Sequence, residues 1–341
     1  MSDVIEIDGS YHEGGGQIVR TAVGLSAITG KSCRIFNIRK GRCNQGLAAQ
    51  HLRSIEACTR ICNGKLTGDE IGSCEIEFHP GEIGGGRYDI DVGTAGSIPL
   101  VLQTIVLPVA YSGKKFSFNV VGGTDVKWSP NIGYFQHIFC DFMKKVGVDI
   151  AVDVKVHGFY PKGGGNVFVN VSSSGVGLIN LVERGDFEHV DVWSIATQDL
   201  EGAKVSERQV AGFGNILKID RKNEGYVESL STGSAVHAHV HYTNCKLGAS
   251  ALGDRGKKAE DVGRSCAVEL KNSVDSGACL DRHMADQILP YMALSVMKNN
   301  GFCRVSVEEI TGHVRTNIWV IEKFLPVKFD IIKNVVSCRR I

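Results

Sequence analysis

Glycine triplets recur along this chain, and they constrain its fold more than any other feature of the sequence. They occupy residues 14–16, 84–86 and 163–165, and the last two have similar flanks, FHPGEIGGGRYDIDV and HGFYPKGGGNVFVNV. Each of these flanks reads as a turn that leads into a strand with alternating apolar residues. Glycine is also abundant, with 41 residues among 341, so the chain is expected to contain many tight turns.

A longer pattern is also used three times. The segments LSAITGKSCRIFNI (25–38), LPVAYSGKKFSFNV (107–120) and LSVMKNNGFCRVSV (294–307) each read as the end of a helix, a glycine cap and a short strand. A helical pattern follows each of them, at 47–62, 132–146 and 317–324. The sequence therefore predicts a unit of strands and two helices that is repeated three times, with a period of about 80–100 residues.

The third copy of this unit is interrupted. Its glycine-triplet strand ends near Val171, whereas its helix–glycine–strand element begins near Asp281. The residues between them carry strand and helix patterns of their own. We therefore predict an α/β (α+β) fold. A body of three repeated units comprises 1–179 and 279–341, and a small α/β domain is inserted at 180–278.

The composition is that of a folded chain without a membrane or secretory segment. The 38 Lys and Arg residues nearly balance the 37 Asp and Glu residues, which argues against a polybasic protein. No apolar run approaches the roughly 18 residues of a membrane-spanning helix, and the first residues do not have the pattern of a signal peptide. Eleven cysteines without a CxxC pair suit a reducing compartment, so we expect a cytoplasmic protein.

The N-terminal segment DGSYHEGGGQIVRTA places a glycine turn directly before an amphipathic helix. Backbone N–H groups at a helix start attract phosphate, and glycine lets an anion approach closely. Glu13 could hold a divalent cation that bridges to that phosphate. A capped helix with an acidic neighbour explains the same residues without a ligand, and the pattern alone does not decide between the two.

A basic turn follows in NIRKGRCNQGLAAQHLRSIEA. Arg39 and Arg42 come at the end of a strand, just before a helix that carries Gln50 and His51. Arginine side chains match phosphate oxygens in bidentate geometry, so this turn is a candidate phosphate contact. A solvated basic turn is the alternative. Gln103, the one strongly polar side chain of an apolar helix, either serves a neighbouring backbone or contacts a ligand.

Two histidines near the C-terminus are candidates for chemistry. His283 opens the helix of DRHMADQILPYMAL, and His313 follows a glycine in EEITGHVRTNIWVIEKF. Neutral imidazole can attack phosphorus, although a histidine in such a place is more often structural. His237, His239 and His241 alternate along one strand face, a spacing that could chelate a metal. Because no carboxylate or thiol evidently completes that set, we interpret it as an exposed or edge-strand face.

Ordered segments along nearly the whole chain resemble the RNA 3′-terminal phosphate cyclase family. They are IDGSYHEGGGQIVRTA, IRKGRCNQGLAAQHL, GTAGSIPLVLQT, VVGGTD, HGFYPKGGG, HMADQILPYMAL and GHVRTNIWVIEKFLPVKF. The family fold, three repeated units and one inserted small α/β domain, agrees with the prediction above. The resemblance implies an ATP-dependent ligase of RNA processing. Its partners are ATP and RNA that ends in a 3′-phosphate, with no membrane; no particular oligomeric state is implied.

The resemblance implies a reaction in three steps. A histidine attacks the α-phosphorus of ATP and becomes adenylated, and AMP then passes to the RNA 3′-phosphate. The neighbouring 2′-OH attacks that activated phosphate, which leaves a 2′,3′-cyclic phosphate. Ring closure of this kind has the advantage of an intramolecular attack, and RNA is required because DNA lacks the hydroxyl.

The resemblance also assigns individual residues. His313 matches the family's nucleophilic histidine, and Glu13 matches its carboxylate close to a divalent metal, Mg²⁺ or Mn²⁺. The ATP-binding positions match Gln103, Pro130, His283, Met284, Ala285, Asp286 and Gln287. The positions that would contact the triphosphate or the RNA end match Arg20, Arg39, Arg42, Gln50 and His51.

Three alternatives compete with this interpretation. A cyclase-like branch of the family is a non-catalytic RNA- and protein-binding factor of ribosome biogenesis that lacks the nucleophilic histidine; His313 and the intact HMADQ segment favour the enzyme. Enolpyruvyl transferases have a related repeat, but the motifs here do not match a phosphoenolpyruvate site. Adenylation of other phosphate ends, including DNA 5′-phosphates, would be an added activity of the same enzyme.

Overall fold

The computed structural model of this protein describes residues 4–93 and 95–341 and arranges their strands in four sheets of four strands. Residue 94, in the segment GTAGSIPLVLQT, lies outside that description, as do residues 1–3 of the predicted body. Three of the four sheets have the same strand order and the same pattern of parallel and antiparallel neighbours, as described next.

Each repeated unit pairs its first two strands in parallel and adds two antiparallel strands beside the second. The first unit has the order β1 (Ile5–Asp8), β2 (Cys33–Phe36), β4 (Ile76–His79), β3 (Lys65–Thr67). The second has the order β5 (Gly86–Asp91), β6 (Phe116–Gly122), β8 (Gly165–Ser173), β7 (Val148–Val156). The third has the order β9 (Asn180–Leu181), β14 (Phe302–Ser306), β16 (Val335–Arg340), β15 (Val327–Ile332). The predicted α+β fold of three repeated units is therefore confirmed.

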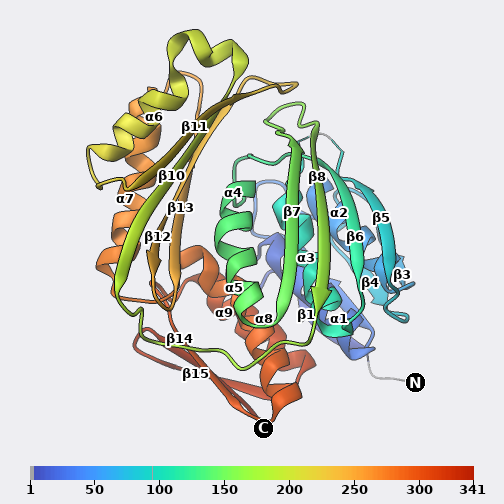
Figure 1. The fold of residues 1–341 in the computed structure, drawn as a ribbon. Helices are drawn as coiled ribbons and strands as arrows, with labels where there is room; N and C mark the ends of the chain where they lie inside the picture. Colours follow the sequence, from blue (N-terminus) through green and yellow to red (C-terminus); the bar gives the residue numbers. More distant parts are fainter. Residues whose placement is uncertain (1–3, 94) are drawn as a thin grey trace.

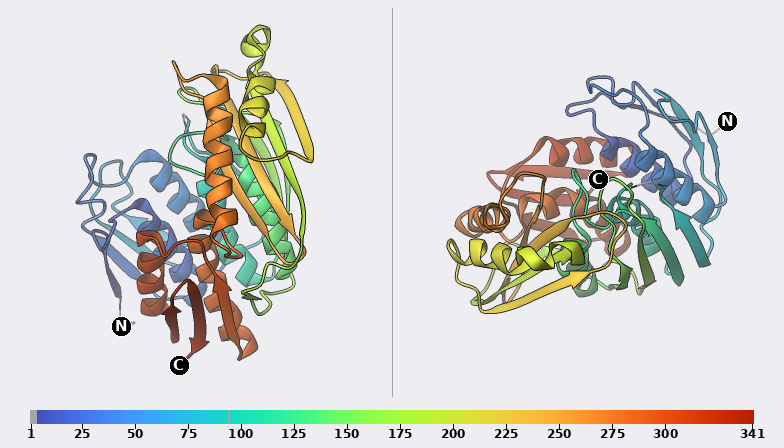
Figure 2. Two further views of the ribbon diagram at one scale, coloured as in Figure 1. Left: turned by 90° about the vertical axis from the view of Figure 1, so that its left-hand side faces the viewer. Right: turned by 90° about the horizontal axis from the view of Figure 1, so that it is seen from above.

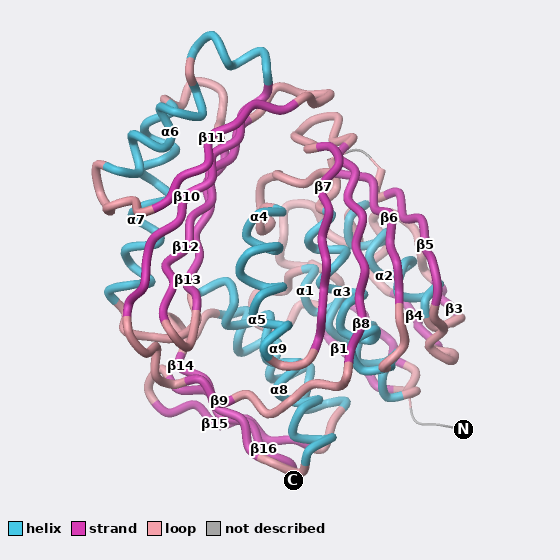
Figure 3. Tube along the Cα trace, in the orientation of Figure 1, coloured by secondary structure: helices cyan, strands magenta, loops and turns pink. Residues whose placement is uncertain are grey.

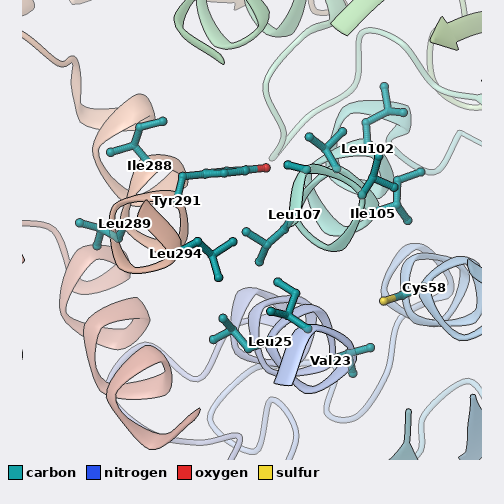
Figure 4. Packing of buried hydrophobic residues seen from close by; sticks show 14 of the residues in the cluster. Val23, Leu25, Cys58, Leu102, Ile105, Leu107, Ile288, Leu289, Tyr291 and Leu294 are labelled. Carbon is teal, nitrogen blue, oxygen red and sulfur yellow. The ribbon is translucent and has the colours of Figure 1, made fainter. Parts of the chain in front are cut away.

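Two helices belong to each unit, one after its first strand and one after its second. They are α1 (Gly16–Thr29) and α2 (Ala49–Ile61) in the first unit and α8 (Arg282–Asn299) and α9 (Gly312–Phe324) in the third. In the second unit, α3 (Ile98–Ser112) is followed by a longer helix made of α4 (Ile132–Tyr134), the π-helical turn η1 (Phe135–Phe139) and α5 (Cys140–Lys145). The helix α3 contacts both α1 and α8 in the interior, where Leu25, Leu107 and Leu294 pack together (Figure 4).

The sequence pattern indicated that the third glycine triplet begins the third unit, and this prediction was wrong. The triplet leads into β8, which lies between β6 and β7 as the last strand of the second unit. The first strand of the third unit is instead β9, which has two residues and pairs in parallel with β14. A glycine turn before an alternating strand describes both β5 and β8, and such a pattern carries no information about which strand becomes the neighbour.

The helix caps follow the sequence pattern in two units of three. Gly30 and Gly113 end α1 and α3 with φ of 70° and 67°, in the left-handed region that glycine occupies without a steric penalty. At the end of α8 the left-handed residue is Asn300, with φ of 48°, and not the glycine that follows it. Asparagine also occurs in the left-handed conformation at such a cap.

The insertion forms the fourth sheet, between β9 and α8 of the third unit. Its strands have the order β11 (Arg221–Val227), β10 (Phe187–Thr197), β12 (Ser234–Tyr242), β13 (Lys246–Leu252). The 3₁₀ helix η2 (Gln198–Ala203) and the helices α6 (Val205–Gly214) and α7 (Ala259–Asp275) complete it, with α6 and α7 on one face of the sheet (Figure 1). Valine, leucine and alanine side chains under those helices form a hydrophobic cluster separate from that of the body. The domain limits 180 and 278 stay a prediction.

The other face of the insert sheet lies toward the body. The helix α4–η1–α5 runs between this sheet and the sheet β5–β8 (Figures 2 and 3) and contacts β12, β13 and β7. In the described parts of the chain, none of the helices combines the length and the apolar character that a membrane span needs.

Histidine side chains form part of the contact between the helix α4–η1–α5 and the insert sheet. His137 of η1 stacks on Trp193, His237 and His239 of the insert sheet, with ring centroids 4.9–5.4 Å apart. The interpretation of His237, His239 and His241 as an exposed or edge-strand face was therefore wrong. Their strand, β12, lies in the middle of the sheet, and His239 is 2% exposed. A strand's own alternation does not reveal that a helix from another unit covers its polar face.

We expect acid to loosen this contact. Burial, with smaller contributions from His137 and His157, lowers the pKa of His237 to about 3, whereas an unfolded histidine titrates near 6.5. As the pH falls below about 6.5, the His237 ring binds a proton in the unfolded chain but stays neutral in the folded protein. The free energy of unfolding therefore decreases by up to about 1.4 kcal/mol per pH unit. Urea unfolding in EDTA buffer at pH 7.5 and 5.5 measures this loss. His237→Gln is expected to reduce it, and equal losses in both proteins would contradict the assignment.

Candidate functional site

A cleft of about 1610 Å³ lies where the body meets α7 of the insert. The starts of α1, α2, α8 and α9 and the loop before α2 contribute to its lining. Twelve of the fourteen residues that the resemblance assigns line it: Glu13, Arg20, Arg39, Arg42, Gln50, His51, Gln103, Pro130, His283, Asp286, Gln287 and His313. The side chains of Met284 and Ala285 do not; they belong to the hydrophobic core, with exposed fractions of 1% and 0%.

The start of α1 lines one end of this cleft. Its cap residue is Gly15, which has no side chain to accept a hydrogen bond from the first N–H groups of the helix. Such an uncapped start carries partial positive charge and unpaired donors, which suit an anion. A side chain at Gly15 would lie 3.7 Å from the His313 ring and 3.8 Å from the Arg42 guanidinium, so the helix start, the histidine and the arginine meet at one place.

Position 16 requires glycine because the His51 ring packs directly against its backbone. A Cβ there would lie 2.0 Å from Nε2 of His51. The ring is 5% exposed, and its Nδ1 accepts a hydrogen bond of 3.2 Å from the Ala48 N–H at the start of α2. Burial, together with Arg20 and Arg39, lowers the pKa of His51 to about 3. His51 is therefore a neutral side chain that joins the starts of α1 and α2.

Three arginines surround the same end of the cleft. Arg42 donates from Nη2 to the Glu13 carbonyl at 2.9 Å, and Arg39 donates from Nη1 to the Gly46 carbonyl at 3.0 Å. Arg20 extends from α1 toward Asp286; burial lowers its pKa to about 10, which the carboxylate of Asp286 opposes. Each arginine keeps most of its five N–H donors for a ligand, so the predicted basic turn is a cluster directed at the cleft.

His313 lies opposite, in the first turn of α9, which begins at Gly312. Its Nδ1 is 2.9 Å from Oε2 of Glu13. A Cβ at Gly312 would lie 2.6 Å from the Glu13 side chain, so glycine at this position allows the contact. The carboxylate can only accept at neutral pH, which favours the tautomer with the proton on Nδ1 and leaves the lone pair on Nε2. His313 and Glu13 are each partly exposed, at 46% and 38% of the side chain.

Glu13 fits a metal ion that is shared with a ligand better than one held by protein alone. Among the described residues, the groups of three potential metal ligands do not include Glu13. One carboxylate beside phosphate-binding groups is how Mg²⁺ is often bound, with water and substrate phosphates supplying the remaining oxygens. Oε2 contacts His313, and Oε1 is the second oxygen of the same group.

The other end of the cleft is built by α8 and α3. Asp286 accepts from the Gln17 amide at 2.5 Å, and burial raises its pKa while His313, His283 and Arg20 oppose that shift. Gln103 donates to Gln287 at 2.7 Å, so the amide of α3 pairs with a side chain of α8.

A hydrogen bond to a residue of the insert positions the His283 side chain. Its Nε2 lies 2.6 Å from Oε1 of Glu269 on α7. Burial lowers the pKa of His283, but the Glu269 hydrogen bond and the neighbouring Asp281 and Asp286 outweigh it, so the pKa is raised.

Sequence reasoning missed the insert's share of the cleft. Asp261, Ser265, Glu269 and Asn272 line the cleft and lie three or four residues apart on α7, a spacing that places them on one helix face. It also missed Trp128, which lines the cleft with 94% of its surface exposed and a φ of 67°. The i, i+3 polar spacing on α7 was visible in the sequence, but nothing there linked it to residues of the body.

Comparisons with known proteins show the family of this chain. A family model described as RNA 3′-terminal phosphate cyclase matches residues 11–331. A protein of that name from Methanosarcina barkeri is 43% identical over 97% of each chain. Those from Archaeoglobus fulgidus and Pyrococcus furiosus are 41% and 40% identical over 96% of this chain and 98% and 95% of the relatives. These matches define a class of RNA-end-modifying enzymes. The chain belongs to the RNA 3′-terminal phosphate cyclase family.

Proposed function

We propose that this protein is an RNA 3′-terminal phosphate cyclase of the cytoplasm that uses ATP to convert a 3′-phosphate end into a 2′,3′-cyclic phosphate. Family membership supports the reaction, and the observation that carries the site is the His313–Glu13 contact beside the uncapped start of α1. The eleven cysteines are free thiols, which fits a reducing compartment.

His313 is the proposed nucleophile. Nε2 attacks the α-phosphorus of ATP, a P–N bond forms, the bond to the β-phosphate oxygen breaks, and pyrophosphate leaves. Glu13 accepts from Nδ1 and stabilises the imidazolium that develops during attack, as a carboxylate does in other histidine dyads. Arg42, Arg39 and the N–H groups of α1 stabilise charge on the triphosphate. A divalent ion at Glu13 would supply further charge stabilisation on the phosphate oxygens.

The second and third steps use the same residues. An oxygen of the RNA 3′-phosphate attacks the histidine-bound phosphorus, the P–N bond breaks, and an RNA-adenylate forms. The ribose 2′-OH then attacks the phosphorus of the RNA 3′-phosphate. The bond from that phosphorus to the AMP oxygen breaks, AMP leaves, and the hydroxyl proton is lost. The cleft has room for both reactants, since about 1610 Å³ exceeds the roughly 300–1000 Å³ of a typical small-molecule site. Trp128, with its exposed ring, offers a surface on which an RNA base could stack.

The base end of ATP is proposed to lie along α8. His283, positioned by Glu269, and Pro130 present surfaces for adenine, and the Gln103–Gln287 pair offers amide groups to it. Met284 and Ala285 act through the backbone and packing of α8, because their side chains lie in the core.

The reaction is tested with a short labelled RNA that ends in a 3′-phosphate. With ATP and Mg²⁺ or Mn²⁺, we expect its end to become resistant to phosphatase. The matched oligonucleotide has a 2′-deoxyribose at the last position and is expected to stop at the adenylated stage, because it lacks the attacking hydroxyl. If folded protein leaves both oligonucleotides unchanged while binding RNA, the proposal fails in favour of the non-catalytic RNA-binding factor.

Arg42→Ala is expected to lower the rate of adenylation about 10- to 100-fold, because it removes a charged donor from the triphosphate site. The free energy of unfolding should change by no more than about 0.5 kcal/mol, since the residue is exposed. Arg60→Ala is the matched control. It also removes an exposed arginine that donates to a backbone carbonyl, that of Asp89, but it does not line the cleft. Equal rates in the two variants would show that the turn is only a solvated surface.

A further inference from the structure

The histidines of the insert sheet form a second cluster outside the cleft. Asp191 and His239 are direct cross-strand partners on β10 and β12, and His189 and His241 are the next pair on the same face. The two strands therefore place three imidazoles and one carboxylate in a block of four. Nothing in the proposed cyclase reaction uses these residues.

Three ligating atoms converge within this block. Nδ1 of His239 lies 2.9 Å from Nε2 of His241, which lies 3.1 Å from Oδ2 of Asp191. One potential ligand atom from each of the three residues lies within 4.8 Å of the other two. A tetrahedral Zn²⁺ with bonds of about 2.0–2.2 Å separates its ligand atoms by roughly 3.3 Å, which is close to the observed spacing.

The hydrogen bonds available in the protein do not satisfy these atoms. Nε2 of His241 faces both His239 and Asp191, and one ring nitrogen carries at most one proton, so only one neighbour can accept from it. Oδ1 of Asp191 and Nε2 of His239 are buried, and neither has a hydrogen-bond partner among the described residues. Asp191 is 4% exposed, and a buried carboxylate that lacks full pairing is costly. A cation bound by Nδ1 of His239, Nε2 of His241 and the Asp191 carboxylate would satisfy the two nitrogen lone pairs and the buried negative charge together, and would leave the ring proton of His239 on Nε2.

The charges around the block leave room for one cation. Lys246 pairs with Asp141, and Arg221 donates toward Nε2 of His189 at 3.2 Å. His189 is therefore engaged by Arg221 in this arrangement, although it also lies 3.4 Å from Oδ2 of Asp191. The side chains of His189 and His241 are 17% and 14% exposed, which provides a path from solvent.

We propose that Asp191, His239 and His241 bind a divalent transition-metal ion, for which Zn²⁺ is the best chemical match. Imidazole nitrogens with one carboxylate suit Zn²⁺, whereas a single carboxylate such as Glu13, completed by water and phosphate oxygens, suits Mg²⁺ or Mn²⁺. The ion joins β10 to β12 on the face that packs against His137, so it stabilises the contact between insert and body. Water, or His189 released from Arg221, takes the fourth position.

The test is a Zn²⁺ titration of the untagged full-length protein after treatment with a chelator, against a chromogenic competitor and with millimolar Mg²⁺ present. Wild-type protein is expected to bind one Zn²⁺ per chain, and Zn²⁺ should raise its melting temperature. His241→Gln and Asp191→Asn should each lower the affinity at least tenfold. His79→Gln should not, although His79 also lies beside a carboxylate, Glu77, at 3.1 Å.

Two results would overturn the proposal: wild-type protein that binds no Zn²⁺ against the competitor, or variants at positions 191 and 241 that bind as tightly as His79→Gln. If those variants fail to fold, wild-type protein loaded with Co²⁺ decides instead. A strong visible spectrum of four-coordinate Co²⁺ supports the site, and the weak spectrum of six-coordinate Co²⁺ rejects it.

Discussion

His313→Ala is expected to abolish conversion of a 3′-phosphate RNA end, with a rate at least about 10³-fold below that of the wild type. The variant loses the only atom that we propose to form a bond with AMP, and removal of a covalent nucleophile is among the most damaging changes to an enzyme. The fold should be kept, because the side chain is 46% exposed and its ion pair is with Glu13, which is itself partly exposed. The measurement is RNA end conversion, with circular dichroism to verify folding.

Two companion variants make this result specific. His79→Ala removes a partly exposed histidine that also contacts a glutamate, and it should react like the wild type. Glu13→Gln should reduce the rate less than His313→Ala, because the amide still contacts the ring but no longer stabilises its positive charge. A His313→Ala protein that cyclises RNA at even a tenth of the wild-type rate would remove His313 from the chemistry.

The second large effect is on stability. Asp281→Ala is expected to lower the free energy of unfolding by about 3–5 kcal/mol. Asp281 is fully buried and caps α8 by accepting from the N–H groups of His283 and Met284. It also accepts from the Tyr134 hydroxyl at 2.7 Å and from the Gly248 N–H at 3.0 Å. The substitution removes a helix cap and leaves two buried donors without a partner.

Asp281 therefore joins the body helix α4, the insert strand β13 and α8 at one carboxylate. Chemical denaturation measures the effect, and Asp254→Ala is the control. Asp254 also links insert to body, through Lys127 at 2.6 Å, but its side chain is 54% exposed, so its removal should cost less than about 1 kcal/mol. Similar losses in both variants would contradict the view that burial makes the Asp281 contacts important.

Much of this architecture could be predicted because each repeated unit has sequence patterns that depend only on nearby residues. Helix ends, caps at Gly30 and Gly113 and alternating strands depend on neighbours in sequence, and they gave the three units. The assignment of the third triplet strand was wrong because strand order depends on pairing between distant segments. The two-residue strand β9 is too short to produce a periodic pattern.

The candidate site divides in the same way. The resemblance supplied fourteen residues from helices and loops along the chain, and the structure brings twelve of them to one cleft. It did not supply the Glu13–His313 contact, the wall formed by α7 or the Glu269–His283 bond, since each joins segments far apart in the chain. The side chains of Met284 and Ala285 could not be assigned from the motif alone, because a motif does not state which face of α8 is buried.

The histidines of β12 illustrate the opposite failure. Read along one strand, they lacked a carboxylate. Asp191, on the neighbouring strand β10, lies directly across from His239, and the pairing of two segments about 50 residues apart in sequence brings them together. A metal site of this kind becomes visible only when the sheet register is known.

The central claim is that AMP becomes bound to His313. The most direct measurement incubates the purified protein with ATP and Mg²⁺ or Mn²⁺, digests it at neutral to alkaline pH, and locates the adenylated peptide by mass spectrometry. The account predicts one AMP on the peptide that contains His313, stable in alkali and lost in acid, as expected of a bond between phosphorus and nitrogen. AMP on any other residue, or no adenylated peptide from folded protein, would contradict it.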